Sequence, residues 1–185
     1  MATTKKNSKK KSSSKNNNSV IAIIGLVLAL AMIAMCFLPF ITMKGTITGN
    51  STSANGFDMI FNLFKDGPKS TDSESQAFAY GFKLLDATSS AALMVSIAGL
   101  VAVVAALALA VFYLLSLVGI NAGMLKKILA AVVIVAAILT LVMAFVLAGK
   151  APTILGFAKT TAGIGSYLFA GLGLFAGVPA FLAKK

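Results

Sequence analysis

Hydrophobic residues fall into four long blocks separated by polar segments, and this spacing is the strongest pattern in the chain. The blocks cover residues 20–43, 89–119, 128–149 and 164–183, and none of them contains a charged residue. About 20 apolar residues in a helix cross the roughly 30 Å hydrocarbon core of a bilayer. Each block therefore predicts one transmembrane helix, and the second is long enough to tilt or project.

The polar segments between the blocks set the predicted organisation of the chain. They are a tail at residues 1–19, connections at residues 44–88, 120–127 and 150–163, and a short end at residues 184–185. An even number of spans returns the chain to the side where it started. The sequence thus predicts an all-α membrane protein: an antiparallel four-helix transmembrane bundle with a small extracellular cap of mixed strand and helix.

Lysine placement gives the predicted orientation. All 16 basic residues are lysine, and the polar tail is rich in them: Lys5, Lys6, Lys9, Lys10, Lys11 and Lys15. Cytoplasmic connections carry an excess of lysine, so both termini and the segment with Lys126 and Lys127 are expected inside. We expect the tail to be disordered and to contact anionic headgroups of the inner leaflet, with a protein-docking role left open. A nucleic-acid partner is not expected.

The first block also has features of a cleaved signal peptide, with a basic start and Ala29-Leu30-Ala31 as a cleavage site. The apolar run continues well past that point, which favours an uncleaved membrane anchor. A lipoprotein interpretation of Cys36 needs a small residue before the cysteine, and Met35 is not small. Cys36 is expected to be a buried apolar residue instead.

The connection at residues 44–88 holds the elements of the predicted cap. Residues 43–50 alternate, are rich in β-branched residues and end at a Gly-Asn turn signal, which predicts a strand and a hairpin. Residues 56–65 have helical spacing, and residues 73–76 fit a capping box of a further helix. The aromatic and aliphatic residues of the first helix either pack against the bundle or bind a partner: Phe57, Ile60, Phe61 and Phe64.

Small residues recur every four positions in the predicted spans, which lets helix backbones approach closely in lipid. The stripes consist of Ala98, Ala102, Ala106 and Ala110; of Ala136, Thr140, Ala144 and Ala148; and of Gly173 and Gly177. We expect them to close the bundle within one chain. Self-association into a homo-oligomer, above all through the Gly173 and Gly177 pair, is the alternative.

The chain carries little that enzyme chemistry needs. Histidine is absent, and the one cysteine lies in an apolar block. Histidine is the usual general base and zinc ligand, so we expect no enzyme, no metal and no cofactor. Charged groups, which proton and ion pathways use, are absent from all four blocks. A small transporter or channel subunit acting as an oligomer is the alternative function, with Ser96, Ser116 and Thr140 as its pore-lining hydroxyls.

The layout resembles the claudin-like superfamily of four-span membrane proteins. The likeness lies in the short inner N-terminus, the large first outer loop that begins with a strand, the short inner link, the smaller second outer loop and the fourth span. The family places a Trp and a Cys pair in its first outer loop, whereas this chain has no Trp and a single Cys. The resemblance therefore implies an architecture and assigns no residue a role.

These features together predict a non-enzymatic scaffold, interaction or accessory-subunit protein. It would recognise a membrane or envelope protein through its first extracellular loop. Lysine-rich usage without arginine or tryptophan favours a bacterial source, so the expected location is a bacterial plasma membrane.

Overall fold

Four long helices and a small sheet make up the computed structural model, which describes residues 7–45, 51–61, 90–120, 123–150 and 158–182. The long helices are α1 (Asn7–Ala34), α4 (Ser90–Leu117), α5 (Gly123–Lys150) and α6 (Ile164–Leu182). The short elements are the 3-10 turn η1 (Met35–Phe37), the helix α2 (Gly56–Phe61) and the strands β1 (Pro39–Gly45), β2 (Ser51–Asn55) and β3 (Ala158–Ala162). The predicted capping box at residues 73–76 lies outside the described residues.

All four long helices meet the length and apolarity that crossing a membrane requires. The qualifying stretches are Asn18–Phe37, Leu93–Leu117, Gly123–Gly149 and Ile164–Leu182. They correspond to the four apolar blocks of the sequence, which confirms the predicted number of membrane-length helices in the described chain. The predicted mixture of strand and helix beside them is confirmed as well.

The first block ends as a helix earlier than expected. Helix α1 stops at Ala34, and Leu38 is already extended, with φ −87° and ψ 158°. Pro39 explains the change, because its ring disfavours helical backbone at the preceding residue. The predicted span of residues 20–43 is therefore wrong at its second end, where residues 39–43 belong to strand β1.

Two other predicted boundaries also change. Helix α1 begins at Asn7, so residues 7–19 are helical rather than disordered. Extending an existing helix fixes one residue for each hydrogen bond gained, which is far easier than starting a new one. Helix α5 begins at Gly123, which places Lys126 and Lys127 on a helix instead of in a connection.

Helix α4 ends in a glycine-dependent turn. Gly119 has φ +94°, a conformation that side-chain-bearing residues rarely adopt. The amide of Gly119 donates to the carbonyl of Ser116 at 3.3 Å, and the amide of Ile120 donates to the carbonyl of Leu115 at 2.9 Å. These two bonds form a Schellman motif, which satisfies the last carbonyls of α4 and lets the chain turn toward α5.

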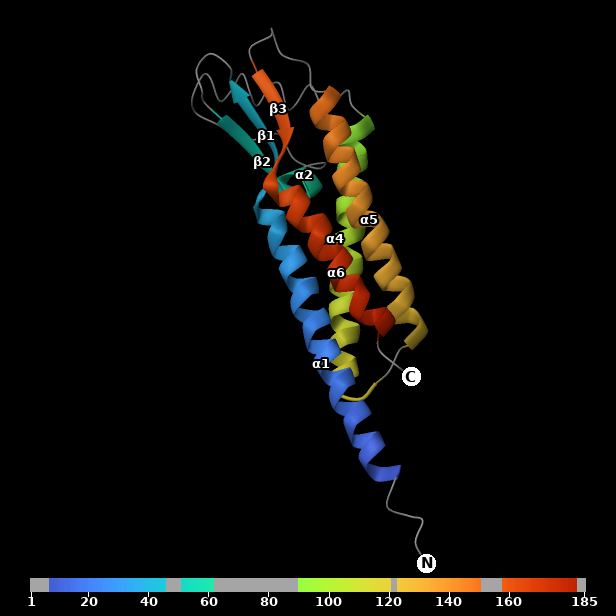
Figure 1. The fold of residues 1–185 in the computed structure, drawn as a ribbon. Helices are drawn as coiled ribbons and strands as arrows, with labels where there is room; N and C mark the ends of the chain where they lie inside the picture. Colours follow the sequence, from blue (N-terminus) through green and yellow to red (C-terminus); the bar gives the residue numbers. More distant parts are fainter. Residues whose placement is uncertain (1–6, 46–50, 62–89, 121–122, 151–157, 183–185) are drawn as a thin grey trace, which may run out of the picture.

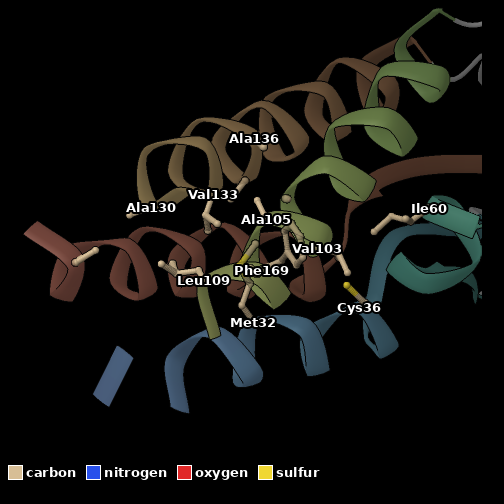
Figure 2. Packing of buried hydrophobic residues seen from close by; sticks show 14 of the residues in the cluster. Met32, Cys36, Ile60, Val103, Ala105, Leu109, Ala130, Val133, Ala136 and Phe169 are labelled. Atoms are coloured by element: carbon tan, nitrogen blue, oxygen red, sulfur yellow. The ribbon is translucent and has the colours of Figure 1, made fainter. Parts of the chain in front are cut away.

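The long helices pack as a ring in which α1 contacts α4 and α6, and α5 contacts the same two helices. Their buried side chains form one cluster, and Figure 2 shows members such as Met32, Leu109, Val133 and Phe169 turned toward one another. The outward side chains are also apolar and largely exposed: Ile23, Val27, Leu30, Val104, Leu107, Val111, Val135, Val142, Phe175 and Phe181.

The sheet has the order β2-β1-β3, and both its pairings are antiparallel. It lies at the end of the bundle farthest from the start of α1 (Figure 1). The pair β1–β2 confirms the predicted hairpin. Its first strand covers residues 39–45 rather than residues 43–50, and residues 46–50 lie outside the described part of the chain. Strand β3, in contrast, was not predicted, because a five-residue segment with two alanines gives too short a signal. It joins the connection before α6 to the connection after α1.

Candidate functional site

The sheet, η1 and α2 together form the part of the described chain that stands apart from the long helices, and we call this unit the cap. Helix α2 is fixed to α4 by a buried side chain. Ile60 is fully buried, and its Cγ1 lies where a Cβ on Gly99 would be only 2.7 Å away. Ser96 of α4 also donates its hydroxyl to the carbonyl of Met59. Gly99 therefore makes the space that lets α2 seat on the bundle.

The start of α2 is held from two further directions. Asn55 caps the helix by accepting the amide of Asp58 at 2.7 Å, and such caps contribute about 1 kcal/mol. The ring of Phe40, fully buried in β1, covers Gly56 and meets Phe169 of α6 edge-on at 5.3 Å. The Phe40 ring thus joins strand β1 to both helix α2 and helix α6.

The join between β3 and α6 approaches β1 so closely that only glycine fits. A Cβ on Gly163 would lie 2.3 Å from the carbonyl oxygen of Pro39, and one on Gly165 would lie 2.7 Å from the same oxygen. The amide of Gly163 donates to the carbonyl of Phe40 at 2.7 Å. Backbone therefore packs on backbone here, which fixes the sheet to α6 without any intervening side chain.

Two phenylalanines of the cap are exposed and stack on each other. The rings of Phe37 and Phe57 lie 5.5 Å apart and nearly parallel, at 11°. Phe37 is 66% exposed and Phe57 is 43% exposed. Phe37 continues the outward apolar stripe of α1, so this pair forms the apolar margin of the cap next to the helices.

Apart from this pair, the cap side chains that are described as exposed are polar. One face of the sheet carries lysine and hydroxyl side chains, and its exposed members are Lys44, Ser51, Ser53, Lys159 and Thr161. The opposite face includes Ile41, which is fully buried, and the sheet contacts α5 through β1 and β3. The cap thus has a buried side against the bundle and a polar side away from it.

The four residues predicted to bind a partner do not share one environment in the structure. Phe57 is exposed, as a binding residue must be. Ile60 is fully buried against α4, so its assignment to a partner-binding surface is wrong, and it anchors the cap instead. Ile60 is buried because Gly99, which has no side chain, leaves room for it on α4. Gly99 is 39 positions away in the sequence, so the helical spacing of residues 56–65 could not indicate this contact. Phe64 and the side chain of Phe61 lie outside the described residues.

The predicted helix-packing stripes lie inside the chain. Seven of their alanine and threonine members are buried: Ala98, Ala102, Ala106, Ala110, Ala136, Thr140 and Ala144; Ala148 is half-buried. Gly173 and Gly177 face α5, where added Cβ atoms would lie 2.6 Å from atoms of Ala137 and Ile134. The alternative that this glycine pair mediates self-association is therefore wrong for the described fold, because α5 already occupies that face.

The tail lysines are divided between α1 and the part of the chain before it. Lys9, Lys10, Lys11 and Lys15 belong to the first turns of α1, and nothing further is described of their side chains, while Lys5 and Lys6 lie outside the described residues. Their predicted contact with lipid headgroups stays a prediction.

A polar cluster that the sequence did not reveal joins the helices at the end opposite the cap. Among the described residues, Lys126 is the one charged side chain that is buried, at 3% exposed. Its Nζ lies 5.5 Å from the ring centre of Tyr113 and donates to the Ser116 hydroxyl at 3.4 Å. A cation is favourable beside the carboxyl end of α4 and over an aromatic face. The pairing holds the first turn of α5 to the last turn of α4.

Tyr113 extends this cluster to two more helices. Its hydroxyl donates to the carbonyl of Ala176 in α6 at 2.8 Å. Its ring lies over Gly25 of α1, where a Cβ would be 2.3 Å from Cζ. Tyr113 thereby contacts α1 and α6 from its place on α4, and its one polar atom has a partner, as a buried hydroxyl requires.

The three hydroxyls considered as pore-lining groups donate within the chain. Ser96 donates to Met59, Ser116 donates to the carbonyl of Phe112 at 2.8 Å, and Thr140 donates to the carbonyl of Ala136 at 2.8 Å. The bonds of Ser116 and Thr140 go to the preceding turn, which is the ordinary way for a hydroxyl to sit in an apolar helix, while the Ser96 bond joins α4 to α2. Their geometry favours a packing role over a conduction path.

The described residues contain no group of three His, Cys, Asp or Glu side chains that could hold a metal ion. The chain matches no protein-family model, no curated protein and no solved structure.

Replacing Ile60 by alanine is expected to lower the free energy of unfolding by roughly 2–5 kcal/mol, because it empties the notch above Gly99. Thermal unfolding of the purified chain in detergent, followed by circular dichroism, measures the loss. Phe57→Ala is the matched control on the same helix, since Phe57 is exposed, and it should cost about 1 kcal/mol or less. Equal losses in the two variants would contradict the anchoring role of Ile60.

Proposed function

We propose that this chain is a four-pass integral membrane protein of a bacterial plasma membrane. It would act as a non-enzymatic scaffold or accessory subunit and recognise a partner protein through its cap. The four helices would form an antiparallel transmembrane bundle, with the cap outside the cell and both termini in the cytoplasm. Within this proposal, the resemblance to claudin-like proteins concerns only the arrangement of spans and loops.

The outward surface of the bundle supports the membrane location. Large apolar side chains are exposed along all four long helices. A soluble monomer rarely exposes a continuous apolar patch beyond a few hundred Å². Lipid tails remove that cost, and the backbone polar groups of a helix are already paired internally.

The lysine pattern and the arrangement of the helices support the orientation. The start of α1 and the end of α6 lie away from the sheet (Figure 1). The lysine-rich tail leads into α1 at that end, and Lys126 and Lys127 begin α5. Excess lysine stays on the cytoplasmic side during insertion, so the cap end faces outward.

The observation that carries the functional proposal is the rigid seating of a polar surface on the bundle. Ile60, Phe40 and the glycines of the β3–α6 join hold the cap at buried, well-packed contacts. Its polar sheet face is exposed beyond them. A surface fixed in advance loses little conformational entropy when it binds a partner, which is what a recognition module needs.

The polar groups within the described helices support a non-enzymatic role. The hydroxyls of Ser96, Thr140 and Ser166 each donate to a backbone carbonyl. Tyr113 and Lys126 also have partners within the bundle. A catalytic group needs a free reactive atom in reach of a substrate, whereas these atoms are committed to packing.

Cysteine labelling in intact cells tests the orientation. In a Cys36→Ala background, Ser53→Cys is expected to react with a membrane-impermeant maleimide from outside, because Ser53 is exposed on the sheet. Lys127→Cys should react only after the membrane is permeabilised. Labelling of position 127 in sealed cells would overturn the proposed topology.

A photo-crosslinking amino acid at position 53 tests recognition in the same cells. It is expected to yield a protein adduct of one defined mass, since the sheet face would contact the partner. The control is the same amino acid at Val104, which is 57% exposed at the middle of α4 and should give lipid adducts. Absence of a defined protein adduct at position 53 would overturn the proposal of partner recognition.

A further inference from the structure

Two lysines from different connections lie side by side on the exposed sheet face. In the register of β1 and β3, Lys44 is directly opposite Lys159, and in the register of β1 and β2 it is directly opposite Ser51. Residues directly opposite in an antiparallel pair project from the same face, with Cβ atoms about 5 Å apart. All three side chains are exposed. The row Ser51–Lys44–Lys159 therefore concentrates two positive charges at one spot.

A second row, of hydroxyls, runs beside the lysines. Thr42 is directly opposite Ser53 on one side and Thr161 on the other. The Thr161 hydroxyl donates to the carbonyl of Thr42 at 3.5 Å, which holds this row together. Successive residues on one face of a strand are about 6.7 Å apart, so the two rows form one continuous polar surface.

The lysine pair is a repulsive arrangement that an anion would relieve. Like charges directly opposite each other destabilise a sheet. In the described part of the chain, the one carboxylate side chain is that of Asp58, on a helix that begins beside Pro39 at the far end of β1. A carboxylate placed between Lys44 and Lys159 would pair with both ammonium groups at once.

The strand geometry favours a carboxylate over a phosphate. Phosphate sites usually draw on free backbone amides at a helix N-terminus or in an amide nest. Strand β1 is central, and its amides are used in pairing with β2 and β3. Only side chains are offered on this face. Lysine supplies a point charge without the planar fork of arginine, so the preference for a carboxylate rests on the lack of free backbone amides.

The position of the pair also argues against lipid headgroups. Lys44 is five residues beyond Pro39, which corresponds to about 16 Å of extended strand. The headgroup layer on each side of a bilayer is about 5–8 Å thick. The apolar stretch of α1 ends at Phe37, and the sheet runs away from that end of α1 (Figure 1). With the hydrocarbon core ending there, a strand of this length would carry Lys44 beyond the headgroup layer.

We propose that this face binds an acidic peptide segment of a partner protein, with Lys44 and Lys159 pairing its carboxylates and the hydroxyl row bonding its backbone. This assignment rests on the proposed function, since it names the chemistry of the partner that the cap recognises. Because Lys159 lies in β3, the second outer connection would contribute to recognition as much as the first.

The test uses the unlabelled full chain in sealed vesicles, and labelling of position 53 from outside in a separate sample shows that the cap faces outward and the tail lysines are hidden from the probe. Fluorescent poly-L-glutamate is expected to bind, and each of Lys44→Glu and Lys159→Glu should weaken binding at least tenfold. Lys127→Glu, which makes the same change of charge inside, should leave binding unchanged. Half-molar salt should abolish the interaction, because it screens exposed charges.

A misfolded variant can lose binding but would not gain a new specific ligand, so a variant that gains one provides a second test. The double variant Lys44→Glu with Lys159→Glu should bind poly-L-lysine, which the natural chain should not. Lysine-dependent binding of polyphosphate or of phosphatidylglycerol vesicles, but not of poly-L-glutamate, would overturn the acidic-peptide assignment. So would binding that both lysine variants leave unchanged. If the adduct at position 53 persists in the double variant, the recognition role stands and this inference fails.

Discussion

Replacing Gly163 by alanine is expected to separate the sheet from α6 and to lower the free energy of unfolding by roughly 2–4 kcal/mol. The new Cβ would lie 2.3 Å from the carbonyl oxygen of Pro39 and 3.1 Å from the carbonyl carbon of Phe40. Backbone atoms cannot rotate away as a side chain does, so the strand must shift. The shift adds overpacking strain and breaks the bond from the Gly163 amide to Phe40.

Thermal unfolding in detergent measures this loss, and hydrogen exchange of the β1 amides shows whether the sheet is where the change occurs. Gly171→Ala is the matched control. Gly171 lies farther along in α6, and no atom is within 4 Å of the position that its Cβ would take. Alanine there should be neutral or stabilise by up to about 1 kcal/mol, as helix propensity favours it. A Gly163 variant as stable as this control would refute the close backbone contact.

Replacing Gly173 by alanine is expected to destabilise the single chain by roughly 1–3 kcal/mol while leaving its oligomeric state unchanged. The added Cβ would lie 2.6 Å from the Cβ of Ala137, whereas carbon atoms in contact prefer about 3.5–4.0 Å. Helices α5 and α6 would have to move apart by about 1 Å, which loosens contacts along both. Chemical unfolding and sedimentation in detergent measure the two quantities separately.

A compensating substitution makes this prediction specific. Ala137→Gly removes the atom that the new Cβ would meet, so the double variant should recover most of the lost stability. Recovery identifies the α5–α6 contact as the cause. The contrary result is a Gly173 variant that keeps its stability but dissociates from a dimer, which would place the glycine on an outer surface.

Small residues have this role because of the solvent around the helices. Moving an apolar side chain from lipid to a protein interior gains little, so helices in a membrane associate through close contact. The stripes from Ala98 to Ala110 and from Ala136 to Ala144 are buried, and Gly25 leaves room for the Tyr113 ring. These residues set the distance between helices rather than supplying hydrophobic area.

The cap unites parts of the chain that the sequence separates. Strand β1 leaves α1, strand β2 leads into α2, and strand β3 leads into α6. The sheet therefore links α1 to α6, and Ile60 links α2 to α4. A partner held on the exposed face would contact elements attached to three of the four long helices.

The order of apolar and polar residues determined the four long helices and the hairpin of β1 and β2. These features depend on local rules: apolar length and alternation before a turn. Pro39 also acts locally in ending α1, whereas the apolar pattern placed that end at residue 43. The small-residue stripes were also evident, because a period of four residues marks one side of a helix.

Only the tertiary structure decided what those helices and strands contact. It buried Ile60 over Gly99, placed Gly173 against Ala137, and covered Lys126 with Tyr113 and Ser116. It also set Lys159 opposite Lys44 across 115 positions of sequence. Periodicity reveals which side of an element is apolar or small. It carries no information on which distant residue meets that side, because that choice depends on the fit of side chains between helices that fold independently.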